Sequence, residues 1–159
     1  MKTFPKGGVH PPENKIASGA GIETFALPKS VVIPVAQHIG APATVIVQKN
    51  DLVKVGQIIA QSSGFVSANI HSPVSGKVTK VDNFLDTSGY KRKAIAIEVE
   101  GDEWIDSIDQ SEQLVTDISL SADEIVARTL EMGIVGLGGA TFPSHVKLSI
   151  PKGKKAEVL

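Results

Sequence analysis

The chain contains no cysteine among its 159 residues. It therefore cannot form disulfides, supply a thiolate nucleophile, or bind zinc or an iron–sulfur cluster through sulfur. Aromatic residues are also scarce, at 4% of the chain. A hydrophobic core must consequently be built from Val, Ile, Leu and Ala.

Long apolar runs and an excess of charge of one sign are absent too. The formal net charge is -1, which gives no electrostatic reason to expect binding to nucleic acid or to anionic lipid. No run approaches the roughly 20 apolar residues that cross a bilayer, and the N-terminus lacks the apolar stretch of a secretory signal. The sequence thus predicts a cytoplasmic globular chain with no transmembrane segment of its own.

Residues 1–30 are rich in Gly, Pro, Lys and Ser and show little periodicity. The run at residues 7–13, GGVHPPE, is too dense in proline for a helix or a central strand. We expect an extended arm with turns, which could wrap the domain that follows.

Residues 31–100 are predicted to be β structure. Ile95, Ile97 and Val99 alternate with Ala96 and Glu98, and Val53 and Val55 alternate with Lys54. Turn-forming pairs and glycines break the strands into short pieces. Residues 45–59 and 70–81 also echo each other, and their pattern resembles the two four-stranded halves of a biotinyl/lipoyl-like barrel-sandwich hybrid. The predicted fold is therefore mainly β.

This fold raises the hypothesis of a biotin or lipoyl carrier. Such a carrier needs a lysine amine at the tip of the hairpin that joins the two halves. Residues 60–76, which form this connection, contain no lysine, and the nearest ones are Lys54 and Lys77. The carrier hypothesis is therefore rejected.

Residues 101–118 are acidic and polar, and we interpret them as a solvated linker. Residues 119–159 begin with a helix signal: Ser121 and Glu124 form a capping box, and Gly133 is a suitable residue after the helix end. A glycine-rich loop follows. Thr141 is then expected to cap a second helix, with Pro143 in its first turn.

The glycine-rich loop supports two interpretations. Glycines let backbone N–H groups approach a phosphate or a flat ring, and a helix start just beyond would add its positive end. The spacing Gly136, Gly138, Gly139 is nevertheless neither a dinucleotide fingerprint nor a P-loop. The pattern alone leaves a structural helix–loop–helix and a cofactor site equally open.

Other side chains give no catalytic or metal constellation. His10, His38, His71 and His145 are scattered, with no pair at a ligand spacing. No carboxylate pair or Ser/His/Asp set has a recognisable context. We therefore assign no catalytic residue, no metal ligand and no hydrolytic chemistry.

Four segments together resemble the C subunit of the Rnf electron-transport complex: residues 7–15, 37–43, 71–76 and 133–147. The resemblance implies the N-terminal part of a peripheral subunit on the cytoplasmic face of the bacterial inner membrane. It implies partnership with the other Rnf subunits in a redox-driven ion translocase that moves electrons between NAD(H) and ferredoxin. The parent subunit would use FMN, NADH and two 4Fe–4S clusters, whereas these residues alone would hold no cofactor and have no activity.

The resemblance extends to the NADH- and FMN-binding subunit of respiratory complex I, whose glycine-rich stretch lines the flavin and nucleotide site. It implies cofactor contacts for five residues: Gly136, Gly138 and Gly139 approach the flavin or nucleotide, Phe142 packs on a ring and Lys147 meets a phosphate. Val135 and Leu137 stand where arginines are usual, and Thr141 replaces a glycine. A truncated start of an α/β flavin/NADH-binding domain is thus expected over residues 119–159.

Two functions from different classes follow. One is a part of a redox enzyme subunit, with the glycine loop as half of a cofactor site. The other is a non-catalytic barrel-sandwich module that docks its subunit onto partners, because a fold does not by itself determine a function.

Overall fold

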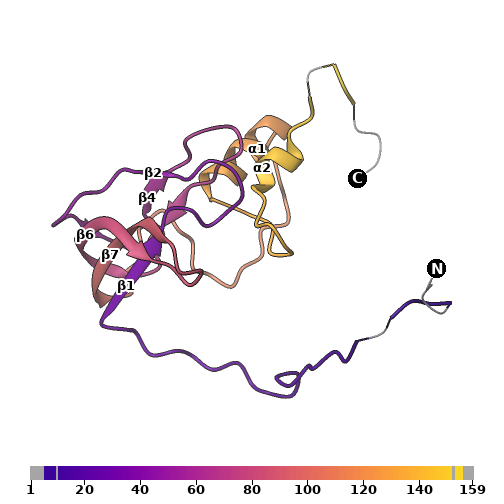
Figure 1. Ribbon diagram of the computed structural model, residues 1–159. Coiled ribbons are helices and arrows are strands. Elements are labelled where there is room, and N and C mark those ends of the chain that lie inside the picture. The colour runs from indigo at the N-terminus through magenta and orange to yellow at the C-terminus, as the bar shows by residue number, and fades with distance from the viewer. Residues whose placement is uncertain (1–5, 10, 152, 156–159) are drawn as a thin grey trace.

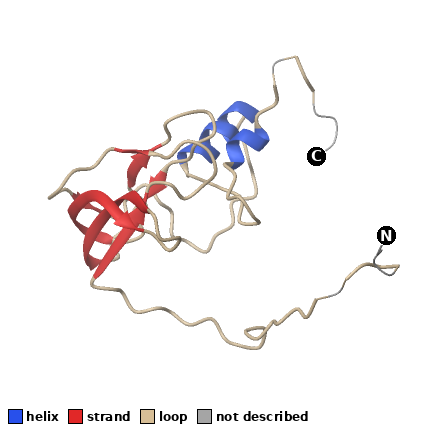
Figure 2. Cartoon of the chain, viewed as in Figure 1, coloured by secondary structure: helices blue, strands red, loops and turns tan. Residues whose placement is uncertain are grey.

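The structure is a computed structural model, and it describes residues 6–9, 11–151 and 153–155. Two antiparallel sheets form the body (Figures 1 and 2). The larger sheet has the strand order β1 (Ser30–Pro34), β7 (Lys91–Gly101), β6 (Ser75–Leu85) and β3 (Leu52–Val53). The smaller sheet has the order β2 (Thr44–Val45), β4 (Ile58–Gln61) and β5 (Ile70–His71). The prediction of a mainly β fold is confirmed.

Strands β6 and β7 form a long hairpin that curls around the core (Figure 1). The alternation predicted for β7 is present: Ile95 and Ile97 are fully buried, whereas Glu98 is exposed. The register between β6 and β7 shifts at two places, between Ser75 and Gly76 and between Val78 and Lys80. Such bulges increase the local bend of a sheet, which lets this hairpin close over the smaller sheet.

The core lies between the two sheets and is aliphatic, as the shortage of aromatic residues requires. Its buried members come from both sheets and from the loops between them: Val35, Ala43, Val53, Ile59, Ala60, Ile70, Val74, Val78, Ile95 and Ile97. Buried side chains from both sheets form one cluster, which is the arrangement of a sandwich. The two sheets nevertheless differ in size, because β2 and β5 of the smaller sheet are only two residues long.

The start of the acidic segment after β7 packs on the barrel. Trp104 makes a parallel bridge with Val55, whose N–H donates to the Glu103 carbonyl at 2.8 Å. Gly56 has a φ of +82°, and a Cβ there would collide with Ile108. The segment thus includes docked residues at its start, whereas residues 109–120 are exposed. The assignment of residues 101–118 as an acidic linker remains a prediction.

Helix α1 (Ala122–Glu131) begins and ends as the sequence predicts. The capping box is present, since Ser121 accepts from the Glu124 N–H and the Glu124 carboxylate accepts from the Ser121 N–H. Gly133 has a φ of +64°, and the N–H of Ile134 donates to the Thr129 carbonyl at 3.2 Å. This hydrogen bond defines a Schellman ending, which satisfies carbonyl groups that a helix end leaves free.

The start of helix α2 (Ser144–Leu148) differs from the expectation. Pro143 is the cap residue and not part of the first turn, and no side chain caps the helix. Thr141 is not a cap: its φ is +49°, and its hydroxyl donates to the Ala140 carbonyl. The reason is the bridge between Val135 and Pro143, which holds Pro143 against Val135 and outside the first turn of the helix.

The described residues of the N-terminal arm, 6–9 and 11–29, do not wrap the barrel. Figure 1 shows its described part running away from β1. The apolar side chains of Ile16, Ile22 and Phe25 are almost completely exposed there. No strand follows α2 within the described residues, and the strand entry suggested by the last residues lies outside them. Among the described helices, none has the length and apolarity needed to cross a membrane.

Candidate functional site

The glycine-rich segment forms a closed loop between α1 and α2. Two backbone hydrogen bonds close it: the Gly136 N–H donates to the Phe142 carbonyl, and the Ser144 N–H donates to the Ile134 carbonyl, both at 2.9 Å. The bridge between Val135 and Pro143 lies between them. Residues 136–142 are therefore a loop with a defined base and not an open tail.

The tip of this loop is backbone with open space around it. A Cβ added to Gly138 or Gly139 would have no heavy atom within 4 Å. Leu137 beside them is 92% exposed. The N–H groups of the tip are thus reachable by a flat ring or a phosphate, which is the property that glycines give to such a loop.

Lys147 and Phe142 lie together at the base of the loop. The Lys147 Nζ is 5.9 Å from the centre of the Phe142 ring. A Cβ on Gly136 would come within 3.1 Å of the same nitrogen, so the side chain folds back over the loop. The structure therefore brings Gly136, Phe142 and Lys147 together and leaves Gly138 and Gly139 at the tip.

The helix expected just beyond the loop is present but short. The helix beyond the loop has only five residues and no side-chain cap. A helix this short adds little dipole to an anion site, because the effect needs a sustained row of aligned peptides. Any attraction for a phosphate thus comes from the Lys147 charge and the loop N–H groups.

Residues of the barrel contact the glycine-rich loop and α2. The sequence did not indicate these contacts. The Ile39 N–H donates to the Ala140 carbonyl at 3.3 Å. His145 in α2 is 5% exposed, and its Nε2 lies 3.0 Å from the Phe65 carbonyl oxygen. A carbonyl only accepts, so Nε2 carries the proton, and the buried Nδ1 has no partner among the described residues. His145 looked like one of several scattered histidines, and nothing in the local pattern sets it apart.

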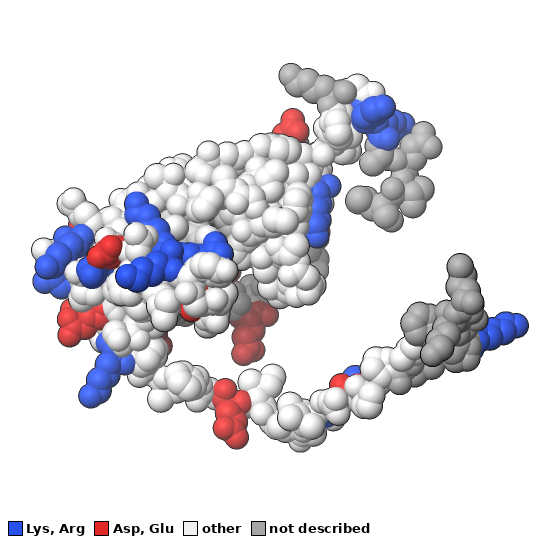
Figure 3. Space-filling model, in the orientation of Figure 1, with Lys and Arg blue, Asp and Glu red and all other residues white. Residues whose placement is uncertain are grey.

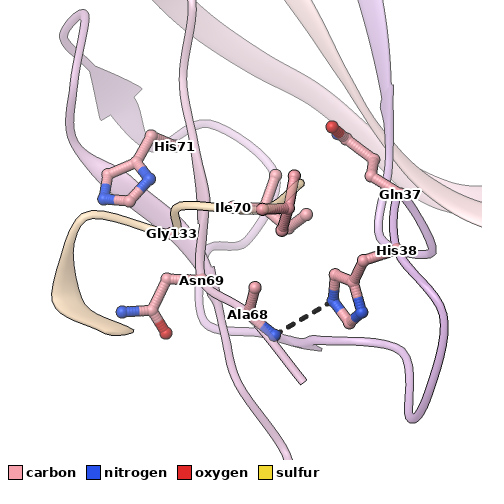
Figure 4. A pocket seen from close by; sticks show the side chains of 8 residues that line it. Gln37, His38, Ala68, Asn69, Ile70, His71 and Gly133 are labelled. Atoms are coloured by element: carbon pink, nitrogen blue, oxygen red, sulfur yellow. Dashed lines mark hydrogen bonds between the residues drawn. The ribbon is translucent and has the colours of Figure 1, made fainter. Parts of the chain in front are cut away.

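A small pocket lies beside these contacts and contains two further histidines. Its volume is about 170 Å³, and His38 and His71 face it from the two halves of the barrel (Figure 4). The His38 Nε2 accepts from the Ala68 N–H at 3.1 Å. Its Nδ1 lies 3.2 Å from the Ile39 carbonyl oxygen, and these two bonds require the neutral tautomer with the proton on Nδ1. His38 therefore joins the loop between β1 and β2 to the loop that precedes β5.

Burial lowers the pKa of His71 below its usual value of 6.5, against opposing effects of the Glu131 carbonyl and carboxylate. The imidazole is half-buried against Gly133, where α1 ends. His71 also borders a larger groove, of about 760 Å³, between the barrel and α1. The apolar lining of that groove comes from Ile58, Ile105, Ile108 and Met132.

The loop that joins the barrel halves is occupied by contacts with the protein itself. Ser63 donates through its hydroxyl to the Pro42 carbonyl at 2.7 Å, and Ser67 donates to the Ala41 carbonyl at 2.9 Å. With the Phe65 contact to His145, this loop is bound to neighbours on both sides. Within the part of the chain that the structure describes, no three His, Asp or Glu side chains are grouped to hold a metal ion.

Known proteins resemble this chain over nearly its whole length. Residues 2–102 match the family described as the RnfC barrel sandwich hybrid domain. The C subunit of a proton-translocating ferredoxin:NAD(+) oxidoreductase complex from Clostridium ljungdahlii is 47% identical over 99% of this chain, which corresponds to 34% of that relative. A Na(+)-translocating counterpart from Acetobacterium woodii is 45% identical over 96% of this chain and 34% of its own length.

A third relative is more distant. The C subunit of an ion-translocating oxidoreductase complex from Rhodobacter capsulatus is 42% identical over 91% of this chain and 28% of its own length. The chain thus spans about a third of the length of the curated relatives it matches. The matches to the relatives extend beyond residue 102, the end of the family match, into the segment that contains the glycine loop.

Proposed function

Because the chain belongs to the RnfC barrel sandwich hybrid domain family, we propose that it serves in the peripheral subunit of a redox-driven ion translocase. That complex would transfer electrons between NAD(H) and ferredoxin at the cytoplasmic face of the bacterial inner membrane. The names of the relatives, which join ferredoxin, NAD(+) and ion translocation, support this assignment. FMN and two 4Fe–4S clusters complete the proposed electron path, with cluster thiolates from outside these cysteine-free residues.

The role proposed for this chain is to hold one side of the flavin or nucleotide. The observation that carries it is the grouping of Lys147 and Phe142 over Gly136, next to an unobstructed glycine tip. A bound flavin would supply the hydride and single-electron chemistry. The chain's own contribution is binding: Lys147 neutralises a phosphate, Phe142 packs on a ring, and the N–H groups of Gly138 and Gly139 approach the ligand.

A titration tests this role. The chain, labelled for NMR, receives FMN or NADH up to millimolar concentration. Weak binding is expected, because the chain supplies only one side of the site, and the shifts should centre on residues 136–147. Lys147→Met should weaken binding at least about fivefold, since it removes a charge-assisted contact to phosphate.

The chain offers a matched control for this variant. The Lys80 Nζ lies 5.8 Å from the centre of the Phe84 ring, close to the distance between the Lys147 Nζ and the Phe142 ring. It stands on β6, outside the glycine loop. Lys80→Met should leave the affinity unchanged. Shifts that avoid the loop, or equal losses in both variants, would contradict the proposal.

We also propose, as a second role, that the barrel is a docking module for the other Rnf subunits. The lysine-free loop at residues 60–76 argues against the alternative role of a carrier, because its Ser63 and Ser67 hydroxyls and the Phe65 carbonyl are engaged with neighbouring loops and α2. A carrier needs that loop free and a lysine on it. Incubation with biotin ligase or lipoyl ligase should therefore leave the mass of the chain unchanged, and a covalent adduct would reopen the carrier function.

A further inference from the structure

Lys147 carries the only positive charge in the segment that contains the glycine loop. No other Lys or Arg occurs between residues 129 and 151. Figure 3 shows Lys and Arg gathered over β6 and β7, whereas the broad surface on the side of the helices is mostly white in this view. A lysine has a long flexible side chain that can point in many directions. Because no neighbouring cation in this segment can replace Lys147, its direction matters for the proposed site.

Helix α2, which bears Lys147, is too short to hold an orientation by itself. It has five residues, and a helix of this length depends on tertiary contacts for its stability. His145 is its buried side chain, and its Nε2 donates to the Phe65 carbonyl at 3.0 Å. Among the side-chain hydrogen bonds of the described residues, this is the one that connects α2 to the barrel.

The geometry of a helix links the direction of His145 to that of Lys147. Two residues apart correspond to about 200° around a helix axis, so the two side chains leave α2 on nearly opposite sides. His145 is buried toward the barrel, whereas Lys147 is exposed. The Lys147 Nζ lies 5.9 Å from the centre of the Phe142 ring and close to Gly136. Fixing the His145 ring on the barrel therefore also fixes where Lys147 points.

A role in stability alone would be served more simply by an apolar side chain. The His145 ring is 5% exposed, and its Nδ1 has no partner among the described residues, so its burial leaves one polar atom unsatisfied. Apolar contact is non-directional, whereas a hydrogen bond weakens steeply away from its preferred angle. The Phe65 carbonyl thus sets the angle of the ring, and the ring sets the rotation of α2.

We propose that His145 is a positioning residue of the cofactor site. By donating to the Phe65 carbonyl, it rotates α2 so that Lys147 lies over Phe142, in the place where it meets a cofactor phosphate. The inference rests on the cofactor-binding role proposed above and names the residue that arranges that site. His145 itself touches no ligand and acts through Lys147.

The first test uses the chain without any cofactor. Nuclear Overhauser cross-peaks between the Lys147 ε-methylene and the Phe142 ring report their proximity, and those between Lys80 and Phe84 serve as the internal reference. His145→Leu and His145→Met remove the donor and keep an apolar side chain, so each should lose the cross-peak at Phe142 and keep the reference. His145→Gln retains a side-chain N–H donor and should keep both.

Asn69→Ala is the matched control for a purely structural role. The Asn69 Nδ2 donates to the Glu131 carbonyl at 3.2 Å, so it connects the barrel to the end of α1 and not to α2. This variant should lower the Tm and leave the cross-peak between Lys147 and Phe142 unchanged. Two-dimensional NMR spectra verify folding, and either apolar variant of His145 that is folded serves. The Gln variant tests the proposal separately.

The second test measures affinity for FMN by NMR titration. His145→Leu should weaken binding at least about fivefold, as is expected for Lys147→Met, because both remove the charge-assisted contact to phosphate. The double variant should bind within about twofold of Lys147→Met, since residues that act through one another are not additive. A purely structural role for His145 would instead add a further loss in the double variant.

Several outcomes would overturn the proposal. A cross-peak between Lys147 and Phe142 that survives in a folded His145→Leu or His145→Met variant would do so. Its loss in a folded His145→Gln variant or in Asn69→Ala would also do so, as would a further loss of affinity in the double variant. The first test contains no cofactor. Absence of FMN binding by the wild-type chain would therefore contradict the cofactor-binding role and leave the result for His145 standing.

Discussion

His145 in α2 donates a hydrogen bond to the carbonyl of Phe65, 80 residues earlier in the chain, at 3.0 Å. The two rings also meet edge to face, with centroids 6.4 Å apart. This contact joins the helix after the glycine loop to the barrel loop that would bear a lysine in a carrier domain. The orientation of Lys147 therefore depends on the barrel.

Replacing His145 by Ala is expected to destabilise the chain by about 2 kcal/mol. The substitution removes a buried ring and leaves the Phe65 carbonyl without its donor. Urea unfolding followed by circular dichroism measures the change. Phe65→Leu is the control, because it keeps the carbonyl and should cost less. An equal or larger loss for Phe65→Leu would show that the ring contact dominates.

Gly133 should not tolerate a side chain. Its φ is +64°, and a Cβ would collide with the Asn69 carbonyl oxygen and press on the His71 ring. Gly133→Ala is expected to cost about 3 kcal/mol, which combines left-handed strain with displacement of backbone.

Gly89 separates these two effects. Its φ is +84°, but a Cβ there would meet nothing within 4 Å. Gly89→Ala should therefore cost only the conformational term, about 1 kcal/mol. Thermal unfolding of both variants measures the difference. Equal losses of stability in the two variants would mean that the close approach of Gly133 to Asn69 and His71 contributes nothing.

The free energy of unfolding should fall as the pH drops from 7 to 5. The pKa of His71 is lowered in the folded chain because burial disfavours its charged form. The unfolded chain therefore binds the proton first, below about pH 6.5, and stability is lost as pH falls toward the folded pKa. His71→Gln should flatten this part of the pH profile. An unchanged slope in that variant would assign the pH dependence to other groups.

Ser121 should contribute about 1 kcal/mol as the cap of α1. Its side chain accepts from the Glu124 N–H, and Ser121→Ala removes that acceptor. Ser119→Ala, two residues earlier in the exposed segment, is expected to be neutral. Chemical denaturation compares the two. A neutral Ser121→Ala would mean that water satisfies the helix start equally well.

Local features of this protein could be predicted from the sequence. The alternation around Ile95 and Ile97 predicted a half-buried strand, and the spacing of Ser121 and Glu124 predicted a helix start. Both signals involve neighbours within a few residues, where backbone geometry alone decides which side chains meet. The glycine-rich loop and the absence of lysine from residues 60–76 could also be read directly from the sequence.

The relations between distant segments were decided only by the tertiary structure. The sequence placed a cap at Thr141, but a bridge between Val135 and Pro143 moved the helix start to Ser144. His145 became a buried link because the barrel carries the Phe65 carbonyl to it. The Ile39 N–H reached the Ala140 carbonyl and the Ala41 N–H reached the Val66 carbonyl only because the fold brings these loops together. Composition and local periodicity determined the strands, the first helix and the absence of thiolate chemistry. Packing between residues far apart in the chain determined what surrounds the loop and which surface is left for a partner, since such contacts leave no period to read.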